Sequence, residues 1–300
     1  MDHQRNLMFW QIYKRGDETI PDAQRRFFKA LPPAEGSARK SQLVLTALLS
    51  RVHDVCCANG IRYWLDFGTL LGAVRHSGFI PWDDGVAIGM MRTDLEKFIT
   101  LLKNDKDLTV RYMLVNSKIN GIAHRCHVRW AEVNGRTFNK NIVIYIYDFC
   151  KQSSDVLWKY FKKEKKEPAD ESKKYPPFTN SKGIEPYRDT FTNLYNFYFE
   201  KVKNKLQITM EDGDNIIWGF DNFYYGKYHD RHLFGHETIF PLRKLSFEGK
   251  EFMVPNRYFE YVNMVYEDMY SLPNDVQRKI FTPKTLEALD AVYKKYVKDE

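Results

Sequence analysis

The chain has 300 residues, of which 43% are hydrophobic and 28% are charged, a balance typical of soluble globular proteins with one large domain or two small ones. Its net charge of +7 is compatible with an anionic partner such as a nucleotide or an acidic glycan, but gives no reason to expect a nucleic-acid partner. The first residues lack an apolar core of signal-peptide length, and no stretch approaches the roughly 20 apolar residues of a membrane span. We therefore expect a cytoplasmic protein without a membrane span.

Neither the cysteines nor the most basic segment indicates a binding site. None of the four cysteines makes a CxxC pair or a Cys/His zinc spacing, so reduced structural thiols are expected; they are Cys56, Cys57, Cys126 and Cys150. Much of the positive charge lies in residues 158–168, "WKYFKKEKKEP". Lys and Glu are mixed there as they are on a solvated helix face, which we favour over an anion-binding patch.

Hydrophobic periodicity predicts strands interleaved with helices. The first helix carries an apolar stripe that includes Leu45, Leu48, Leu49 and Val52, and it ends at Asn59-Gly60. The elements expected after it are a strand at 61–67, a short helix at 69–76, a strand at 85–90, a helix at 92–104, and strands at 125–133 and 141–149 that are joined through Asn134-Gly135. Residues 151–190 are expected to be irregular or partly helical, and helices alternate with aromatic loops in the last third. This order favours an α/β or α+β sheet.

Residues 63–90 read "YWLDFGTLLGAVRHSGFIPWDDGVAIGM" and resemble the parts of a phosphate site. Gly68 at the end of a strand lets the backbone approach a ligand, and the free N–H groups of a helix start favour phosphate. Arg75, about two turns into the helix, is expected either to reach a phosphate or to pair with Asp83 or Asp84.

The same stretch is a poor metal clamp. Phosphoryl transfer usually needs metal ions held by carboxylates, and residues i and i+2 of a strand face the same side, so that a D-x-D pair can present both carboxylates together. Here the same-face set is Asp83, Gly85 and Ala87, of which only Asp83 carries a ligand. Asp84 faces the opposite side of a regular strand. At most one of the two carboxylates of such a clamp is therefore present.

Three blocks of the sequence resemble the LicD family. Residues 63–90 are similar to its signature, W-L-D-x-G-T-L-L-G-A-x-R-H-x-G-F-I-P-W-D-D-D-I-D-I-G. Residues 240–273, "FPLRKLSFEGKEFMVPNRYFEYVNMVYEDMYSLP", resemble the family's phenylalanine-glutamate-glycine, valine-proline and tyrosine-glycine-aspartate ending. Residues 126–130, "CHVRW", resemble its basic strand. Together the matches span residues 43–273 in the family's order.

The resemblance implies a fold. It is an α+β, nucleotidyltransferase-like fold of the DNA polymerase beta type, with a mixed sheet flanked by helices and a mostly helical C-terminal portion. We expect an N-terminal extension (1–38), a LicD-like domain (39–275) with a variable Lys-rich insertion (151–190), and a helical tail (276–300).

The resemblance also implies an activity. The family, to which the fukutin proteins belong, transfers a phospho-alcohol such as phosphocholine or ribitol phosphate from a cytidine diphosphate donor, for example CDP-choline. The acceptor is a cell-surface glycan such as lipopolysaccharide, capsule or teichoic acid, and Mg²⁺ is the expected cofactor. Carried over by position, Gly68 and Thr69 match the phosphate turn, and Arg75 and Arg129 match basic positions near the donor.

Three carboxylate positions of the family are changed in this chain. Its metal pair falls on Gly85 and Ala87, and a further aspartate falls on Tyr145. Asp148, three residues beyond Tyr145, points largely to the other face. We therefore expect no metal ligands, no intact catalytic residue, and a binding or accessory module that acts in glycan decoration, with an intact paralogue as a possible partner.

Two other hypotheses remain open at this point. The chain is an active phosphocholine-type transferase if relocated carboxylates replace the missing ones; the candidates are Asp83, Asp84, Asp66 and Asp148. Alternatively, it is a structural protein whose Gly-Thr turn is a plain connector and whose Asp pair is a cap.

Histidines offer weaker signals. His229, His232 and His236 cluster with Asp230 and Glu237 in "YHDRHLFGHE", but Gly235 interrupts the helical spacing and no H-E-x-x-H occurs, so no metal site is expected there. His76 is as compatible with a packed or hydrogen-bonded role as with a catalytic one.

Overall fold

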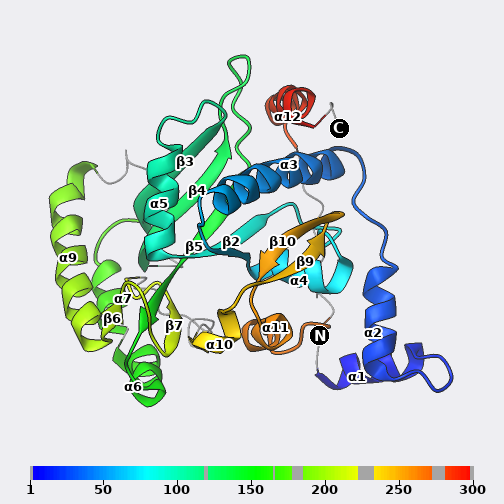
Figure 1. The fold of residues 1–300 in the computed structure, drawn as a ribbon, viewed down its shortest axis with the longest axis horizontal. Helices are drawn as coiled ribbons and strands as arrows, with labels where there is room; N and C mark the ends of the chain where they lie inside the picture. The colour runs from blue at the N-terminus through cyan, green and yellow to red at the C-terminus, as the bar shows by residue number, and fades with distance from the viewer. Residues whose placement is uncertain are drawn as a thin grey trace.

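The computed structural model describes residues 3–117, 121–164, 166–177, 185–221, 233–271 and 281–297. A mixed sheet with the strand order β1-β2-β5-β4-β3 lies at its centre (Figure 1). These strands are β1 (Tyr63–Leu65), β2 (Val86–Met91), β5 (Ile142–Cys150), β4 (Gly121–Trp130) and β3 (Leu108–Ser117). The pair β2–β5 is parallel and the other neighbours are antiparallel. The expected α+β class, with a mixed sheet flanked by helices, is confirmed.

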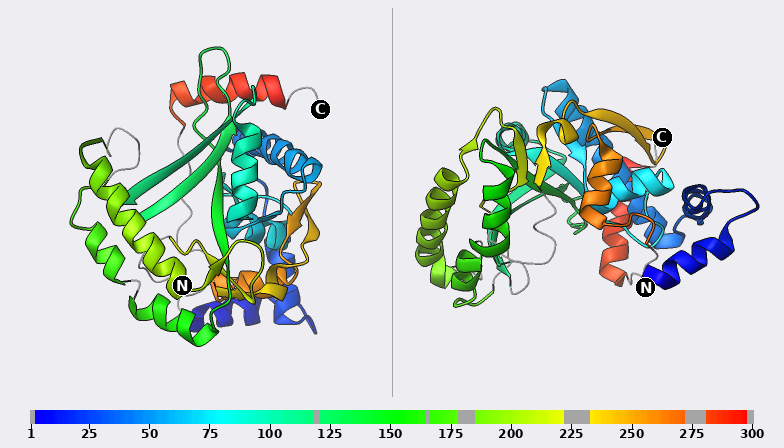
Figure 2. Two further views of the ribbon diagram at one scale, coloured as in Figure 1. Left: turned by 60° about the vertical axis from the view of Figure 1, so that its left-hand side comes forward. Right: turned by 90° about the horizontal axis from the view of Figure 1, so that it is seen from below.

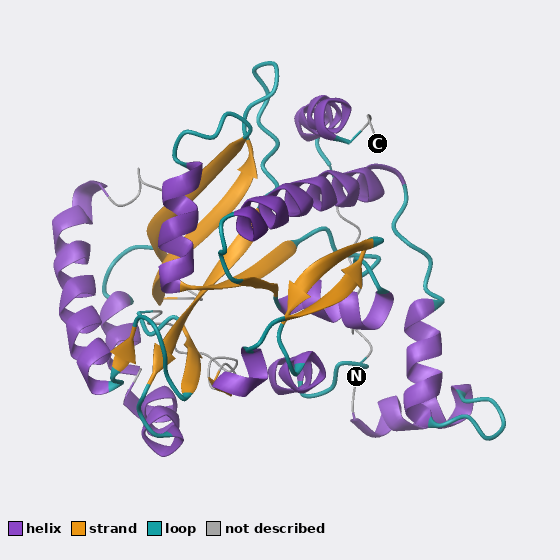
Figure 3. Ribbon diagram, in the orientation of Figure 1, coloured by secondary structure: helices purple, strands orange, loops and turns teal. Residues whose placement is uncertain are grey.

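Helices cover the sheet from both sides (Figure 3). On one side lie α3 (Gly36–Ala58) and α5 (Arg92–Leu102), which pack against β5 and, in the case of α5, also against β2 and β3. On the other side lie α4 (Phe67–His76), α10 (His236–Ile239) and α11 (Tyr258–Tyr266) (Figure 1). One continuous apolar core joins these layers.

Local chemistry sets both ends of α4. The Asp66 carboxylate accepts a hydrogen bond from the backbone N–H of Phe67 (2.8 Å) and caps the helix start. Ser77 takes a left-handed conformation (φ 59°) at the other end, and its N–H closes the helix on Ala73. The short helix therefore begins directly after β1, as the sequence predicts.

A β-hairpin fastens the loop that follows α4. Strands β9 (Arg243–Phe247) and β10 (Lys250–Val254) are joined by Glu248 and Gly249, both with positive φ (53° and 76°), as a tight two-residue turn requires. The Glu248 carboxylate accepts hydrogen bonds from the N–H of Phe79 (2.9 Å) and from Arg39 of α3 (2.7 Å). The two sequence blocks 63–90 and 240–273 are thus joined in space.

A second, smaller core lies at one end of the molecule (Figure 2). It packs beside the strands β6 (Ile208–Thr209), β7 (Asn215–Trp218) and β8 (Leu233–Gly235), of which β6 and β7 both pair with β5. Its helical elements are α6 (Ser154–Lys159), η1 (Tyr160–Glu164), α7 (Lys166–Ser172), η2 (Glu185–Tyr187) and α9 (Arg188–Lys205). Two glutamates of the Lys-rich segment 158–168 form ion pairs with lysines of α9, Glu164 with Lys205 and Glu167 with Lys201. These mixed charges agree with a solvated helix face.

The terminal segments are helical as well. The N-terminal helices are α1 (His3–Tyr13) and α2 (Ile20–Lys29), and α2 packs against α4. Near the C-terminus, α12 (Pro283–Tyr296) packs on α3, and the Tyr296 ring stacks on Trp130 at 3.7 Å between centroids. No disulfide joins the four cysteines. Among the described helices, none combines the length and the apolar character that a membrane crossing needs.

Candidate functional site

The Gly68-Thr69 turn lies where α4 meets β2. The Thr69 hydroxyl is buried and accepts a hydrogen bond from the backbone N–H of Ala87 (2.9 Å), which ties the helix start to the strand. A Cβ added at Gly68 would lie 3.3 Å from a carboxylate oxygen of Asp83, so the glycine lets this carboxylate approach the turn. The phosphate-binding role expected for Gly68 and Thr69 stays a prediction.

Asp83 and Asp84 point in different directions. The Asp83 carboxylate, beside Gly68, accepts a hydrogen bond from the N–H of Gly85 (3.1 Å). Asp84 is buried and forms an ion pair with Lys140 (2.7 Å), while the Ser41 hydroxyl donates to it from α3 (3.2 Å). The charge of Asp84 is thus compensated on the α3 side, as expected for a residue on the opposite face from Asp83.

Two of the three positions at which the resemblance implies a carboxylate, Ala87 and Tyr145, share one face of the sheet. In the parallel pair β2–β5, Ala87 lies opposite Val143 and Gly89 lies opposite Tyr145. Cross-strand partners and residues two apart face the same side, so Ala87 and Tyr145 face the same side on neighbouring strands. Neither of these two residues is a carboxylate.

Aromatic rings surround Tyr145, which lies on the same face of the sheet as Ala87. Phe67, Tyr145 and Trp218, here called the aromatic cluster, contact one another, with ring centroids 4.2 Å (Phe67–Tyr145), 5.4 Å (Tyr145–Trp218) and 5.7 Å (Phe67–Trp218) apart. Burial, with a contribution from the Asp66 charge, raises the pKa of Tyr145 to about 12. The phenol therefore stays neutral. Because Mg²⁺ prefers anionic and carbonyl oxygens in an octahedral set, the residues at these three positions do not fit a magnesium clamp.

Asp66 is fully buried between two tyrosines. The hydroxyls of Tyr147 and Tyr261 donate hydrogen bonds to its two carboxylate oxygens (2.8 and 2.6 Å), and these hydroxyls lie 2.9 Å apart. Burial raises the pKa of Asp66 to about 6, although the tyrosine hydrogen bonds act in the opposite direction. With its acceptor positions occupied by the two phenols and the N–H of Phe67, Asp66 is a structural group rather than a relocated metal ligand.

The raised pKa makes Asp66 a source of pH-dependent stability. Below about pH 4 the carboxyl is protonated in both the folded and the unfolded chain, and as the pH rises through 6 the folded state must ionise a buried group. A shift of about two pKa units corresponds to about 3 kcal/mol. Asp66→Asn removes this titration, so urea unfolding at pH 4.5, 5.5 and 6.5 should show the natural chain losing stability relative to the variant. A pH-independent difference would contradict this assignment.

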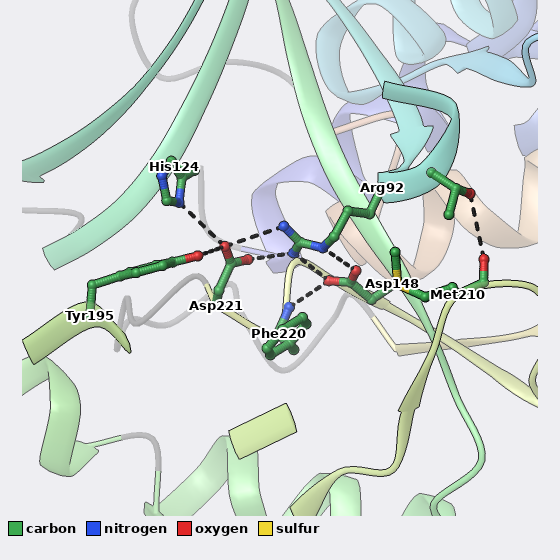
Figure 4. Close-up of polar contacts among 8 residues, drawn as sticks. Arg92, His124, Asp148, Tyr195, Met210, Phe220 and Asp221 are labelled. Atoms are coloured by element: carbon green, nitrogen blue, oxygen red, sulfur yellow. Dashed lines mark hydrogen bonds and ion pairs between the residues drawn. The ribbon is translucent and has the colours of Figure 1, made fainter. Parts of the chain in front are cut away.

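Asp148 lies on the other face of β5, within a buried ionic cluster (Figure 4). Arg92, the first residue of α5, donates to both oxygens of Asp148 (2.6 and 2.8 Å) and to Asp221 (2.6 Å). His124 and Tyr195 contact Asp221 from its other side (3.4 and 2.5 Å), as Figure 4 shows. We call Arg92, Asp148 and Asp221 the Arg92 cluster. It commits Asp148 to an ion pair away from Ala87.

The Arg92 cluster joins the sheet to the second core. Burial lowers the pKa of an arginine, but the two carboxylates outweigh this effect and raise the pKa of Arg92 well above its usual value. Asp221 responds in the same sense: burial disfavours its ionised form, but the Arg92 charge holds its pKa far below the usual range. Because β5, α5 and α9 all contribute to these contacts, the cluster fixes their relative positions.

Arg75 and His76 pack against the N-terminal helices. The buried Arg75 guanidinium donates to the backbone carbonyl of Met269 (2.9 Å) and lies 4.2 Å from the centre of the Phe28 ring. His76 contacts the Phe28 carbonyl through Nδ1 (2.9 Å), and burial lowers its pKa to about 4. Arg75 is seven residues beyond Gly68, roughly 10 Å along the helix. This geometry favours a packing role for both residues, and donor binding by Arg75 stays a prediction.

Arg129, the other basic residue carried over by resemblance, lines a cavity of about 200 Å³ on the outer strands. The lining residues, which we call the basic cavity, are Thr109, Arg111, Met113, His127, Arg129, Asn139 and Asn141. None of them is acidic. The cavity lies on the same face of the sheet as Ala87 and Tyr145, because Ala87, Val143, His127 and Arg111 are cross-strand partners in one row.

Most of the basic cavity does not follow from the sequence. Strand β3, which supplies Thr109 and Arg111, is not among the expected strands. A signal for its partner is present, since polar Arg125, His127 and Arg129 alternate with apolar residues over 125–130. That alternation predicts one open, basic face of β4.

The structure describes only part of the histidine-rich segment. His229, Asp230 and His232 lie outside the described residues. His236 begins α10, and its ring stacks on Phe149 at 6.0 Å between centroids. In the parts of the chain that the structure describes, no three His, Cys, Asp or Glu side chains are grouped to hold a metal ion.

Comparison with known proteins identifies relatives of this chain. Residues 60–176 match the family model described as LicD/FKTN/FKRP, nucleotidyltransferase domain. The chain is 26% identical over 258 residues to the lipopolysaccharide cholinephosphotransferase LicD of Haemophilus influenzae, a match that covers 80% of this chain and 94% of that protein. It is 38% identical over 109 residues to a Rickettsia typhi protein, covering 36% and 32% of the two chains. It is 53% identical over 38 residues to human ribitol 5-phosphate transferase FKRP, covering 13% and 8%.

Proposed function

We propose, on the premise that residues 60–176 match the LicD family model, that this chain binds a participant of glycan phospho-alcohol transfer but does not perform the family's metal-assisted step. Two relatives support the class of reaction, because one is named for cholinephosphate transfer to lipopolysaccharide and another for ribitol 5-phosphate transfer. We also propose that the sheet and α4 correspond to a nucleotidyltransferase-like fold. The chain would then be a binding or accessory module in glycan decoration.

One observation carries this proposal: the aromatic cluster stands where the family's carboxylates would converge. Tyr145 is neutral and packed between Phe67 and Trp218, and Ala87 beside it has no polar side chain. A two-metal clamp stabilises the attacking and leaving oxygens by holding charge at this point. Without carboxylates there, the scaffold retains its shape and loses the charge that positions the metal.

The alternative is an active transferase with relocated carboxylates, and the contacts of three candidates oppose it. Asp66 is held by two tyrosines, Asp84 by Lys140 and Asp148 by Arg92. Asp83 remains a candidate, beside the Gly68 turn. A single carboxylate cannot replace the pair of carboxylates that a two-metal clamp uses.

Calorimetry with CDP-choline tests the proposal. Because the chain lacks the carboxylates that would hold the metal, we expect added Mg²⁺ to change the affinity for CDP-choline less than about twofold, which is about 0.4 kcal/mol of binding free energy. In a turnover assay we expect no release of cytidine monophosphate. Magnesium-dependent turnover above background would overturn the proposal. In that case, loss of turnover in Asp83→Asn but not in Asp84→Asn would establish Asp83 as the relocated ligand.

A further inference from the structure

Two of the residues that line the basic cavity each have a buried polar atom without a hydrogen-bond partner among the described residues: Nδ1 of His127 and Nε of Arg129. Buried polar atoms are normally paired, and these two belong to residues two apart on β4 that face the same side. The residues that line the cavity surround it with cationic, imidazole and amide groups, and none of them is acidic.

The charges around the cavity point to an anion. Arg111 lies opposite His127 across β3–β4, and Arg125 is two residues away on the same face. Burial and then the Arg111 charge lower the pKa of Arg129, with Glu132 as the opposing influence. Burial, Arg125 and Arg111 lower the pKa of His127. Repulsion of this kind is relieved when an anion binds among the cations, and a guanidinium pairs best with phosphate or carboxylate oxygens.

The position of the cavity separates it from the reacting centre of the family. In the row Ala87, Val143, His127 and Arg111, neighbouring strands are about 4.8 Å apart, so the His127 backbone lies roughly 10 Å from that of Ala87 and Arg111 roughly 14 Å. A phosphate clamped by metals at Ala87 would lie within a few ångströms of that residue. The cavity therefore suits a different phosphate.

The size of the cavity also limits its occupant. Sites that enclose drug-sized ligands have volumes of roughly 300–1,000 Å³, whereas the basic cavity has about 200 Å³. This volume accommodates a phosphate and part of a sugar ring, but it is too small to enclose a whole cytidine diphosphate-alcohol. Asn139 and Asn141 add amide groups, which pair with sugar hydroxyls or phosphate oxygens.

We propose that the basic cavity binds the phosphate group of a phosphorylated sugar, with Arg111, His127 and Arg129 as its ligands. His127 and Arg129 contribute from β4, and Arg111 contributes from the neighbouring strand β3. If the proposed function holds, this phosphorylated sugar would belong to the glycan acceptor, and only that assignment rests on the proposed function. The phosphate site itself is independent of whether the chain has lost metal-assisted transfer.

Titration calorimetry at constant ionic strength tests the site with three probes: inorganic phosphate, glucose 6-phosphate and cytidine monophosphate. We expect phosphate and glucose 6-phosphate to bind competitively. Arg129→Gln and Arg111→Gln should each weaken both at least tenfold, since each removes a charge-assisted hydrogen bond. Lys97→Gln, an exposed change on the opposite side of the sheet, is the control of equal charge. Met113→Trp, which fills the cavity and keeps every cation, should also abolish binding.

The outcomes separate the site from the proposed function. Absence of phosphate binding by the natural chain, or unchanged affinity in both arginine variants, would overturn the site. Binding of cytidine monophosphate with the same dependence on Arg111 and Arg129, in place of glucose 6-phosphate, would overturn the assignment to a phosphorylated sugar. Neither result bears on the proposed function, because the effect of Mg²⁺ on CDP-choline binding is measured separately on the natural chain.

Discussion

Replacing Gly85 and Ala87 by aspartate, together with Tyr145→Asp, should make CDP-choline binding depend on magnesium. In this triple variant we expect Mg²⁺ to raise the affinity at least tenfold, a change of about 1.4 kcal/mol, because Mg²⁺ is usually held by one or two carboxylates together with substrate phosphates. In the natural chain we expect almost no effect of the metal. The contrast is the largest functional change that three substitutions in this fold should produce.

The structure can accept the three carboxylates. A Cβ at Gly85 would contact only Asp83, at 3.4 Å, and residue 85 is exposed, with no positive φ. Residues 85 and 87 are about 6.6 Å apart along the strand and face the same side. Tyr145→Asp opens the aromatic cluster on the neighbouring strand. Calorimetry with and without Mg²⁺ measures the result.

A matched control isolates charge from shape. The variant with Gly85→Asn, Ala87→Asn and Tyr145→Asn has side chains of the same size, but it provides no anionic ligands. We expect this variant to bind CDP-choline without dependence on Mg²⁺. If Mg²⁺ changes CDP-choline affinity equally little in the aspartate and asparagine variants, then features other than the missing carboxylates prevent metal binding. In that case the replaced carboxylates do not explain the proposed loss of metal-assisted transfer.

Arg92→Met should destabilise the fold more than any of the other substitutions proposed above. It leaves Asp148 and Asp221, whose side chains are 1% and 3% exposed, without their common cation. Removal of one partner from a buried ion pair typically costs about 3–5 kcal/mol, because a charge remains buried and uncompensated. Urea unfolding at pH 7 should show a loss in that range.

Two further variants distinguish the charge effect from lost packing. Adding Asp148→Asn and Asp221→Asn to Arg92→Met removes the uncompensated charges, and it should recover a large part of the lost stability. Arg51→Met breaks an ion pair with Asp105 whose arginine side chain is 43% exposed, so its cost should stay below about 1 kcal/mol. Equal losses for Arg92→Met and for the triple variant would show that shape, rather than charge, explains the effect.

Much of the fold follows from local patterns in the sequence. The apolar stripe of α3, the Gly-Thr turn before α4 and the alternating residues of β4 and β5 are encoded within short windows. Strand β3 is harder to predict because Arg111, Tyr112 and Asn116 interrupt its apolar residues. It is an outer strand, and polar side chains on its open face weaken the alternation.

The candidate site divides in the same way. Periodicity places Asp83, Gly85 and Ala87 on one face, and the β2–β5 register confirms that Ala87 and Tyr145 share a face. The side chains that Asp66, Asp84 and Asp148 contact lie 43 to 195 positions away in the sequence, as in Ser41–Asp84 and Tyr261–Asp66. Such pairings depend on how the finished layers pack, and no local pattern reports them.

The contacts between distant blocks bear on where this protein can be divided. Three polar groups of residues 63–90 each have a hydrogen-bond partner near the C-terminus: Asp66 has Tyr261, Arg75 has the carbonyl of Met269, and the N–H of Phe79 has Glu248. A fragment ending at residue 176, where the family match ends, would lose all three hydrogen bonds, at about 1–3 kcal/mol for each buried group left short of a partner. A domain holds only about 5–15 kcal/mol in total. The segment that matches the family by sequence is therefore shorter than the segment that can fold, and an expression boundary belongs beyond the last of these partners.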